Sequence, residues 1–178
     1  METPTDMEIV RRVQTGDAEA FGELVNRYSG RIYALALAMV RDAQRAEDVT
    51  QEAFIRAYEH LDGFRGASAF GTWLYRIALN ECLTFLNKQR ANNQLSIDEA
   101  DAEMVNKLEG DSYFSGDETQ RLFQKALHTL PDKQRIVFNL KYFQEMKYEE
   151  ISEILGTSVG ALKASYHHHL LHAAHRLV

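Results

Sequence analysis

The chain has 178 residues with 20 lysines and arginines, 26 aspartates and glutamates, and a formal net charge of −6. The single cysteine, Cys82, excludes an internal disulfide and a zinc site built from cysteines. No run of about 18 apolar residues is present, and the N-terminal METPTDMEIV lacks the basic start and apolar core of a signal peptide, so we expect a soluble cytoplasmic protein.

The acidic residues are concentrated in one segment. Residues 1–90 carry 11 basic and 13 acidic side chains, residues 91–120 carry 1 and 8, and residues 121–178 carry 8 and 5. The distribution of charge is a better guide to partners than the total. The net charge of −6 therefore does not argue against nucleic-acid binding by the two flanking segments.

Helical patterns fill the first 90 residues. The chain has only two prolines, Pro4 and Pro131, and no sustained alternation of apolar and polar residues, which predicts an all-α fold without strands. Asp17 is expected to cap the first helix. The apolar face of that helix is predicted to comprise Phe21, Leu24, Val25, Tyr28, Ile32 and Leu35.

Two further helices are predicted before residue 90. After a turn at residues 41–45, the second helix spans about 46–61 and ends at an Asp-Gly pair. The third helix spans about 69–89. The buried side of the second helix is predicted to comprise Val49, Ala53, Phe54, Ala57 and Tyr58.

Residues 91–118 break the helical pattern. The segment is polar and acidic with scattered Gly and Ser, the composition of a flexible linker that cannot bury enough surface to fold alone. It divides the chain into two small helical domains, residues 1–90 and residues 119–178. The second domain is expected to hold three or four helices, one of them opened by Pro131.

An aromatic and arginine-rich stretch, FRGASAFGTWLYRIALN, occupies residues 64–80. Stacking of a base on an aromatic side chain is worth roughly 1–3 kcal/mol, and glycines let the backbone approach a ligand. Phe64, Arg65, Ser68 and Asn80 are therefore candidates for contact with unstacked bases. For residues at helical spacing, core packing is the favoured interpretation; these are Phe70, Trp73, Leu74, Ile77 and Ala78.

Residues 147–170 have the spacing of a helix-turn-helix: a short helix, a tight turn at Gly156, and a second helix beginning near Ser158. The alternative is that these two helices are only a compact packing unit. In DNA-binding versions the start of the second helix enters the major groove. The candidate base-reading residues are Ser158, Ala161, Lys163, Ala164, Ser165, His167 and His168.

Five histidines crowd the end of the chain, where Lys163 and Arg176 are the only permanent cations after Gly156. Because phosphate contacts supply most non-specific affinity, this domain alone is expected to bind DNA weakly. His168 and His172 lie at i, i+4, but no carboxylate or cysteine follows to complete a metal shell, so no metal site is expected. Without a nucleophile and base pair or a phosphate loop, we expect no enzyme, no cofactor and no small-molecule substrate.

Four stretches of this sequence occur in a recognisable order: DAEAFGELVNRYSGRIY, AEDVTQEAFIRAYEHLDGFRG, SAFGTWLYRIALNECL and LPDKQRIVFNLKYFQEMKYEEISEILGTSVGALKAS. Together they resemble the extracytoplasmic-function (group IV) sigma factors of the sigma-70 family, the promoter-recognition subunits of bacterial RNA polymerase. The resemblance covers nearly the whole chain. It implies an alternative sigma factor, with residues 1–90 as region 2 and residues 119–178 as region 4.

The resemblance also implies where core RNA polymerase is bound. In the family, the helix holding AEDVTQEAF docks on the clamp helices of the polymerase's largest subunit. Without the resemblance, a solvated charged face would be the favoured interpretation of this helix. With it, the predicted docking residues are Asp48, Gln51, Glu52 and Arg56.

Residues 64–80 match the family's loop and helix that melt the minus-10 element and capture a base flipped from the non-template strand. Residues 64–70 match the capturing loop, and Asn80 matches the floor of its pocket. Ala67 stands where some members have a polar or acidic residue, so the captured base stays open. The predicted minus-10 residues are Phe64, Arg65, Gly66, Ala67, Ser68, Ala69, Phe70, Trp73, Arg76 and Asn80.

The helix-turn-helix matches the domain that reads the minus-35 element as duplex. The implied partners are core RNA polymerase, promoter DNA and an anti-sigma factor, since family members are commonly held inactive by one. No heptad seam is present, so a monomer is expected outside the holoenzyme.

The alternative function is a free-standing helix-turn-helix regulator with a helical sensor domain, which would need tight DNA binding of its own.

Overall fold

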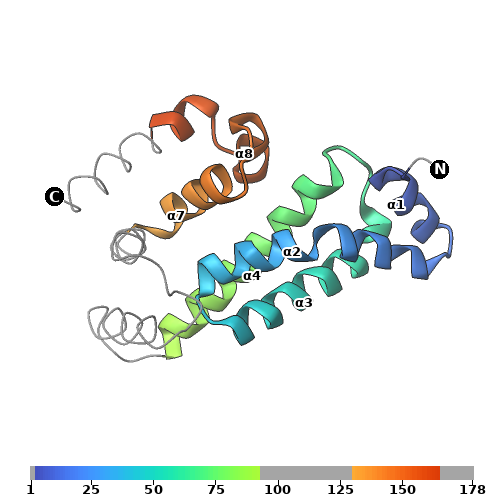
Figure 1. The fold of residues 1–178 in the computed structure, drawn as a ribbon, viewed down its shortest axis with the longest axis horizontal. Coiled ribbons are helices and arrows are strands. Elements are labelled where there is room, and N and C mark those ends of the chain that lie inside the picture. Colours follow the sequence, from blue (N-terminus) through green and yellow to red (C-terminus); the bar gives the residue numbers. More distant parts are fainter. Residues whose placement is uncertain (1–2, 93–129, 165–178) are drawn as a thin grey trace.

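The computed structural model describes residues 3–92 and 130–164 of the chain, and within these two ranges every regular element is a helix (Figure 1). The prediction of an all-α fold is confirmed. Three long helices lie alongside one another: α2 (Phe21–Val40), α3 (Ala43–Glu59) and α4 (Phe70–Asn92). The remaining elements are α1 (Asp6–Gln14), the 3-10 turns η1 (Ala18–Ala20) and η2 (Leu61–Gly63), α7 (Asp132–Phe138), the π-helical η4 (Asn139–Phe143) and α8 (Tyr148–Leu155).

The sequence patterns did not predict α1. A capping box begins this helix: the Thr5 hydroxyl accepts a hydrogen bond from the Glu8 amide at 3.3 Å, and the Glu8 carboxylate accepts one from the Thr5 amide at 2.7 Å. The hydrogen bonds that the Thr5 amide and the Thr5 hydroxyl donate to the Glu8 carboxylate lower the pKa of Glu8. The helix has only nine residues, and two of them, Ile9 and Val10, are buried. So short a segment holds few apolar positions, and the Thr5–Glu8 capping box was the sequence signal that could have found it.

The connection between α2 and α3 is tighter than the predicted turn at residues 41–45. Arg41 ends α2 in the left-handed conformation with φ 61°. Asp42 then caps α3, accepting a hydrogen bond from the Arg45 amide at 2.9 Å. With that cap in place α3 begins at Ala43, so the predicted start at residue 46 is three residues late.

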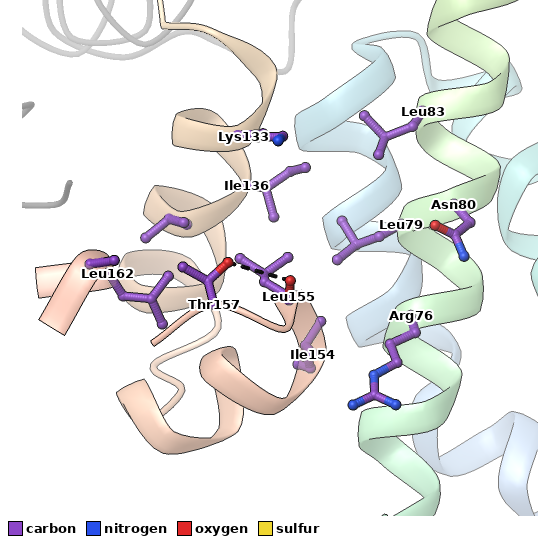
Figure 2. Close-up of a pocket in the computed structure, with 12 residues that line it drawn as sticks. Arg76, Leu79, Asn80, Leu83, Lys133, Ile136, Ile154, Leu155, Thr157 and Leu162 are labelled. Atoms are coloured by element: carbon purple, nitrogen blue, oxygen red, sulfur yellow. Dashed lines mark hydrogen bonds between the residues drawn. The ribbon is translucent and has the colours of Figure 1, made fainter. Parts of the chain in front are cut away.

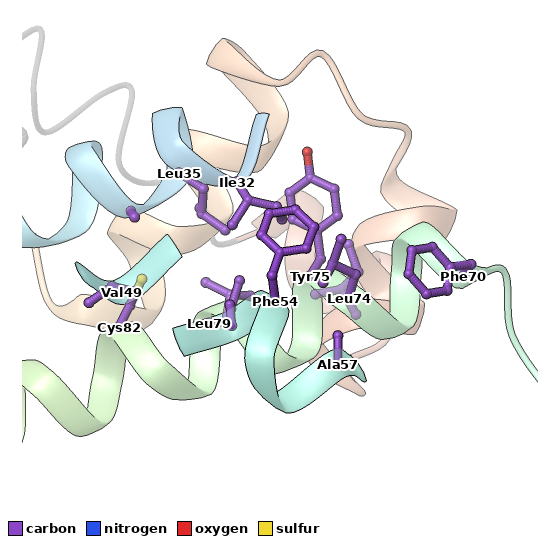
Figure 3. Packing of buried hydrophobic residues seen from close by; sticks show 14 of the residues in the cluster. Ile32, Leu35, Val49, Phe54, Ala57, Phe70, Leu74, Tyr75, Leu79 and Cys82 are labelled. Carbon is purple, nitrogen blue, oxygen red and sulfur yellow. The ribbon is translucent and has the colours of Figure 1, made fainter. Parts of the chain in front are cut away.

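The core of the helical bundle lies between α2, α3 and α4, and Figure 3 shows its central side chains. Most of the predicted apolar positions on α2 and α3 are buried, as expected. Val25 and Tyr28 are half-buried, and Tyr58 is exposed: 46% of this residue is accessible, and its ring meets Phe21 edge-on at 5.1 Å. The expectation that Tyr58 lies on the buried side of its helix is therefore wrong.

Pro131 immediately precedes α7, as predicted, and the described part of the second domain packs on α4. Leu140, Ile151 and Leu162 belong to the same cluster of buried side chains as the core of the bundle. The predicted linker at residues 91–118 lies outside the described residues except for its first two positions.

Candidate nucleic-acid and polymerase interface

The solvent-facing side of α3 presents the residues predicted to dock on the polymerase. Asp48 and Gln51 are exposed, and Asp48 forms a loose ion pair with Arg45 at 3.6 Å in which both side chains are 59% exposed. Glu52 accepts from Arg56 Nε at 3.0 Å. All four predicted docking residues therefore lie on the accessible surface of one helix.

Two neighbours of these residues were missed by sequence reasoning. Arg56 Nε also lies 2.7 Å from a carboxylate oxygen of Glu81 on α4, whose side chain is only 13% exposed. This ion pair connects α3 to α4, although Arg56 itself faces solvent. Ile55 is 52% exposed and lies on the same side of α3 as Gln51, one turn away. Its position four residues after Gln51 was a usable signal, whereas nothing in the sequence pointed to Glu81.

The predicted capture loop, residues 64–70, begins and ends at a buried phenylalanine. Phe64 is 7% exposed and Phe70 is 1% exposed, and their rings meet edge-on at 5.9 Å. Between them Arg65, Gly66, Ala67 and Ala69 are exposed and Ser68 is half-buried. The loop thus has a hydrophobic base and a solvent-facing tip.

Phe64 was expected to contact unstacked bases rather than to pack in the core, but its side chain belongs to the core. Its ring packs against Trp73 with a centroid separation of 4.9 Å and an interplanar angle of 40°. Trp73 also contacts Phe70 at 5.8 Å and is only half-buried. Among these three aromatic residues, Trp73 is therefore the one with surface accessible to a base in this conformation.

Arg76 and Asn80 lie further along α4, where the second domain approaches it. Both are exposed, and Asn80 is about 10 Å beyond Trp73 along the helix axis. They line a cleft of about 490 Å³ whose opposite wall includes Lys133, Ile136 and Ile154 (Figure 2). The structure therefore separates the predicted minus-10 residues into a loop group and a cleft group.

Polar contacts join the two sides of this cleft. The Arg76 guanidinium donates to the carbonyl oxygen of Glu153, with Nε at 3.0 Å. The Tyr75 hydroxyl donates to Gln144 Oε1 at 3.1 Å, and burial raises the pKa of Tyr75 to about 12, so it remains a neutral donor. Tyr75 is 2% exposed and so has no surface for stacking on a base in this conformation.

The helix-turn-helix geometry is present in residues 148–164. Gly156 ends α8 in the left-handed conformation with φ 62°, which a side chain would disfavour. The next helix starts at residue 159, and the Ser158 hydroxyl accepts from the Ala161 amide at 3.3 Å as its cap. The predicted reading residues in the described part are all exposed, whereas Ser165, His167 and His168 lie outside it; the exposed ones are Ser158, Ala161, Lys163 and Ala164.

Comparisons with known proteins agree with this arrangement. The Sigma-70 region 2 profile matches residues 24–92, and the Sigma-70 region 4 profile matches residues 120–170. The ECF RNA polymerase sigma factor SigW of Bacillus subtilis is 37% identical over 166 residues, covering 89% of each chain. The ECF RNA polymerase sigma-E factor of Escherichia coli is 35% identical over 171 residues, covering 92% of this chain and 89% of its own.

The chain therefore belongs to the extracytoplasmic-function sigma factors of the sigma-70 family. It is an alternative sigma factor, a DNA-binding protein of transcription initiation. The resemblance noted from the four sequence stretches is confirmed.

Solved structures share the fold. CnrH, solved in complex with the cytosolic domain of CnrY, superposes with a TM-score of 0.66 over 97% of this chain and 94% of its own, at 24% identity. The sigma factor RpoE of Bartonella quintana, solved with the anti-sigma factor NepR, gives 0.61 over 88% of this chain and 93% of its own, at 23% identity. Within residues 3–92 and 130–164, no helix is both long enough and apolar enough to cross a membrane.

Proposed function

We propose that this sigma factor docks on core RNA polymerase through the exposed side of α3, captures the minus-10 non-template strand with residues 64–80, and reads the minus-35 duplex with its helix-turn-helix. Residues 1–90 form the docking and melting domain in this proposal, and residues 119–178 form the minus-35 domain. The observation that carries it is the accessible acidic and apolar surface of α3 beside an exposed loop that leads into α4.

Support for docking comes from the mixed chemistry of the α3 surface. An exposed isoleucine, Ile55, lies among Asp48, Gln51 and Glu52. Protein interfaces commonly combine an apolar centre with a polar rim, and the charges set orientation and association rate. We therefore add Ile55 to the proposed docking residues.

Support for strand capture comes from the rigid base of the loop. Phe64, Phe70 and Trp73 form one aromatic cluster, and the loop between the two phenylalanines faces solvent. A base leaving the duplex loses a few kcal/mol of stacking, which a preformed aromatic and polar site offsets. Trp73 is proposed as the stacking surface and the loop backbone as the hydrogen-bonding edge. Asn80 and Arg76 are proposed to contact the strand further along α4.

Support for minus-35 recognition comes from the exposed start of the helix after Gly156. Ser158 and Lys163 supply polar and positive groups there, and Ala161 and Ala164 allow close approach to the groove floor. Lys163 Nζ lies 5.7 Å from the centre of the Tyr148 ring, a cation–π contact that holds it near the turn.

We further propose that the protein acts in the cytoplasm as a monomer outside the holoenzyme, that it catalyses no reaction itself, and that an anti-sigma factor regulates it. The structural relative RpoE was solved with the anti-sigma factor NepR, and CnrH was solved with the cytosolic domain of CnrY, which supports the last point. The cleft between α4 and the second domain is lined by apolar and polar groups from both domains.

The deciding experiment is transcription in vitro with purified core RNA polymerase on a library of promoter sequences. We expect core-dependent initiation on a subset of templates, whose shared sequence is the recognised promoter. Absence of initiation on every template would refute the proposal.

A gel shift on the selected duplex, with and without core polymerase, separates this proposal from a free-standing helix-turn-helix regulator. A sigma factor should need the core enzyme for stable binding, because its second domain has few permanent cations near the reading helix. Equal binding without core would favour the regulator.

A further inference from the structure

The capture loop has few internal restraints. No hydrogen bond to the backbone of residues 65–68 is found among the described residues. Gly66 is in the left-handed region with φ 73°, a conformation that few other residues adopt at low cost. The shape of this loop therefore depends on contacts made at its ends and from outside.

One side chain outside the loop supplies such a contact at its start. Gln14, the last residue of α1, donates from Nε2 to the Leu61 carbonyl at 2.8 Å and to the Phe64 carbonyl at 3.1 Å. Gln14 Nε2 thus donates to the carbonyls of the first residue of η2 and of the residue that follows η2, 47 and 50 residues away in the sequence. The bonds are partly buried, where they are worth more than at an open surface.

The same helix touches the middle and the far end of the loop. An ideal Cβ on Gly66 would lie 3.2 Å from Met7 Cε, so this methionine packs directly over the glycine. Asp6 accepts a hydrogen bond from the Tyr28 hydroxyl at 2.5 Å, and the Tyr28 ring lies against Gly71 just after the loop. Helix α1 therefore braces the loop at its start, its middle and its end.

We infer that Gln14 is a positioning residue for promoter opening, because its side-chain amide sets the conformation in which residues 64–69 meet the displaced strand. The inference rests on the proposed role of that loop in strand capture. Helix α1 lies before residue 24, where the match to the region 2 profile begins, so the profile does not include this contact.

The test compares Gln14→Glu, which keeps the shape but replaces the donor by acceptors, with Gln14→Met, which removes the donor without adding charge. Asn26→Asp makes the same charge change at an exposed position on α2 and serves as the control. Each variant is measured for core affinity, for its unfolding transition, and for the rate of promoter opening on the template selected in the transcription assay.

A direct readout of loop position is also available, because Trp73 is the only tryptophan and packs against Phe64. Both Gln14 variants are expected to make Trp73 more accessible to quenching by acrylamide. They are expected to slow promoter opening about tenfold, the effect of losing two hydrogen bonds, while core affinity stays close to wild type and the unfolding transition shifts by no more than those two bonds account for. The control should change none of these.

Four outcomes are distinguishable. Unchanged quenching in both variants would show that Gln14 does not hold the loop, and loss of core affinity in both would show a merely structural role; each overturns the inference. Normal opening in the Gln14 variants, with slow opening in Arg65→Ala or Ser68→Ala, would also overturn it while leaving the proposed function intact. Normal opening in the Gln14 and the loop variants together would refute the loop's role in capture.

Discussion

Gly71, the second residue of α4, lies against the ring of Tyr28. An ideal Cβ at this position would be 3.0 Å from both Cε1 and the hydroxyl oxygen of Tyr28, tighter than nine in ten real Cβ contacts. Tyr28 cannot simply swing away, because its hydroxyl is hydrogen-bonded to Asp6. Glycine is therefore required at position 71 because the backbone of α4 packs directly against the Tyr28 ring.

We expect Gly71→Ala to lower the free energy of unfolding by about 1–3 kcal/mol, the usual cost of overpacking. Gly22→Ala is a matched control, since Gly22 is also the second residue of a helix after a phenylalanine and has no atom within 4 Å of an ideal Cβ. That control should be neutral or stabilising by up to about 1 kcal/mol. Urea unfolding of both variants makes the comparison, and equal midpoints would contradict it.

Cys82 is fully buried, and burial raises the pKa of its thiol to about 12. The thiol should therefore remain protonated at pH 8, and iodoacetamide should alkylate it at least about 100-fold more slowly in the native protein than in urea. Equal rates in both conditions would show that the site is open to reagent.

The raised pKa also predicts a pH dependence of stability. The folded state favours the neutral thiol, so this contribution is complete below the unfolded pKa of about 8.5 and is lost as the pH rises toward 12. The urea midpoint of the wild type should fall more steeply over that window than the midpoint of Cys82→Ala, which has no thiol to titrate. Parallel curves would disprove the assignment.

At the scale of elements, α3 has an inner side that packs in the bundle and an outer side that faces solvent. Its inner side buries Val49, Ala53 and Phe54 in the bundle, while its outer side carries Asp48 and Gln51 with little contact to the rest of the fold. An exposed ion pair such as Arg45 with Asp48 contributes about 0–1 kcal/mol. Changes on the outer side can therefore affect docking without affecting folding.

We expect Asp48→Arg to weaken binding to core RNA polymerase about tenfold or more through charge reversal at the proposed docking face. The free energy of unfolding should stay within about 1 kcal/mol of wild type, because the Arg45 pair is weak. Glu19→Arg, an equal charge change at an exposed position in η1, is the control. Fluorescence anisotropy with labelled protein measures the affinities, and an unaltered value for Asp48→Arg would remove this residue from the docking face.

For the whole molecule, α4 is the element that joins the two domains. Its Arg90 forms paired hydrogen bonds to Asp132 at 2.8 and 3.0 Å, and these bonds lower the pKa of Asp132. Nearer the N-terminus of α4, Arg76 reaches the Glu153 carbonyl, and Leu79 and Leu83 face the second domain across the cleft (Figure 2). One helix thus carries the proposed strand-contacting residues and the contact with the second domain.

We expect Arg76→Ala to increase the fraction of molecules with separated domains roughly fivefold, because a charge-assisted hydrogen bond to Glu153 is lost at a partly exposed site. Single-molecule energy transfer between dyes on Gln44→Cys and Glu149→Cys reports the separation. The native Cys82 is buried and should remain unlabelled. Arg11→Ala is the control, and an equal change in both variants would contradict a specific role for Arg76.

Local patterns were sufficient for most of the helical elements and for the class of the protein. Apolar residues at helical spacing predicted the core positions Leu24, Ile32 and Leu35, which are fully buried. Gly156 and Ser158 predicted the turn and the start of the next helix, because turn and cap chemistry depends on adjacent residues. The proposed docking residues of α3 come from the resemblance to the family, because an exposed charged helical face alone is ordinarily a solvated surface.

Long-range contacts were beyond the reach of those patterns. Tyr58 has the spacing of a buried residue yet stays half exposed, since burial depends on which neighbour covers the helix. Helix α1 was missed altogether, and with it the contacts from Met7 and Gln14 to the capture loop.

By itself, the sequence determined an all-helical chain, its acidic middle segment, the helix-turn-helix and the membership of the sigma-70 family, since each depends on composition or on residues close together in the chain. Only the tertiary structure decided that Phe64 is buried against Trp73, that Arg76 and Asn80 line a cleft with the second domain, and that Gln14 donates a hydrogen bond to the Phe64 carbonyl. Each of these depends on groups from separate helices meeting in space, and packing rather than local propensity selects those partners.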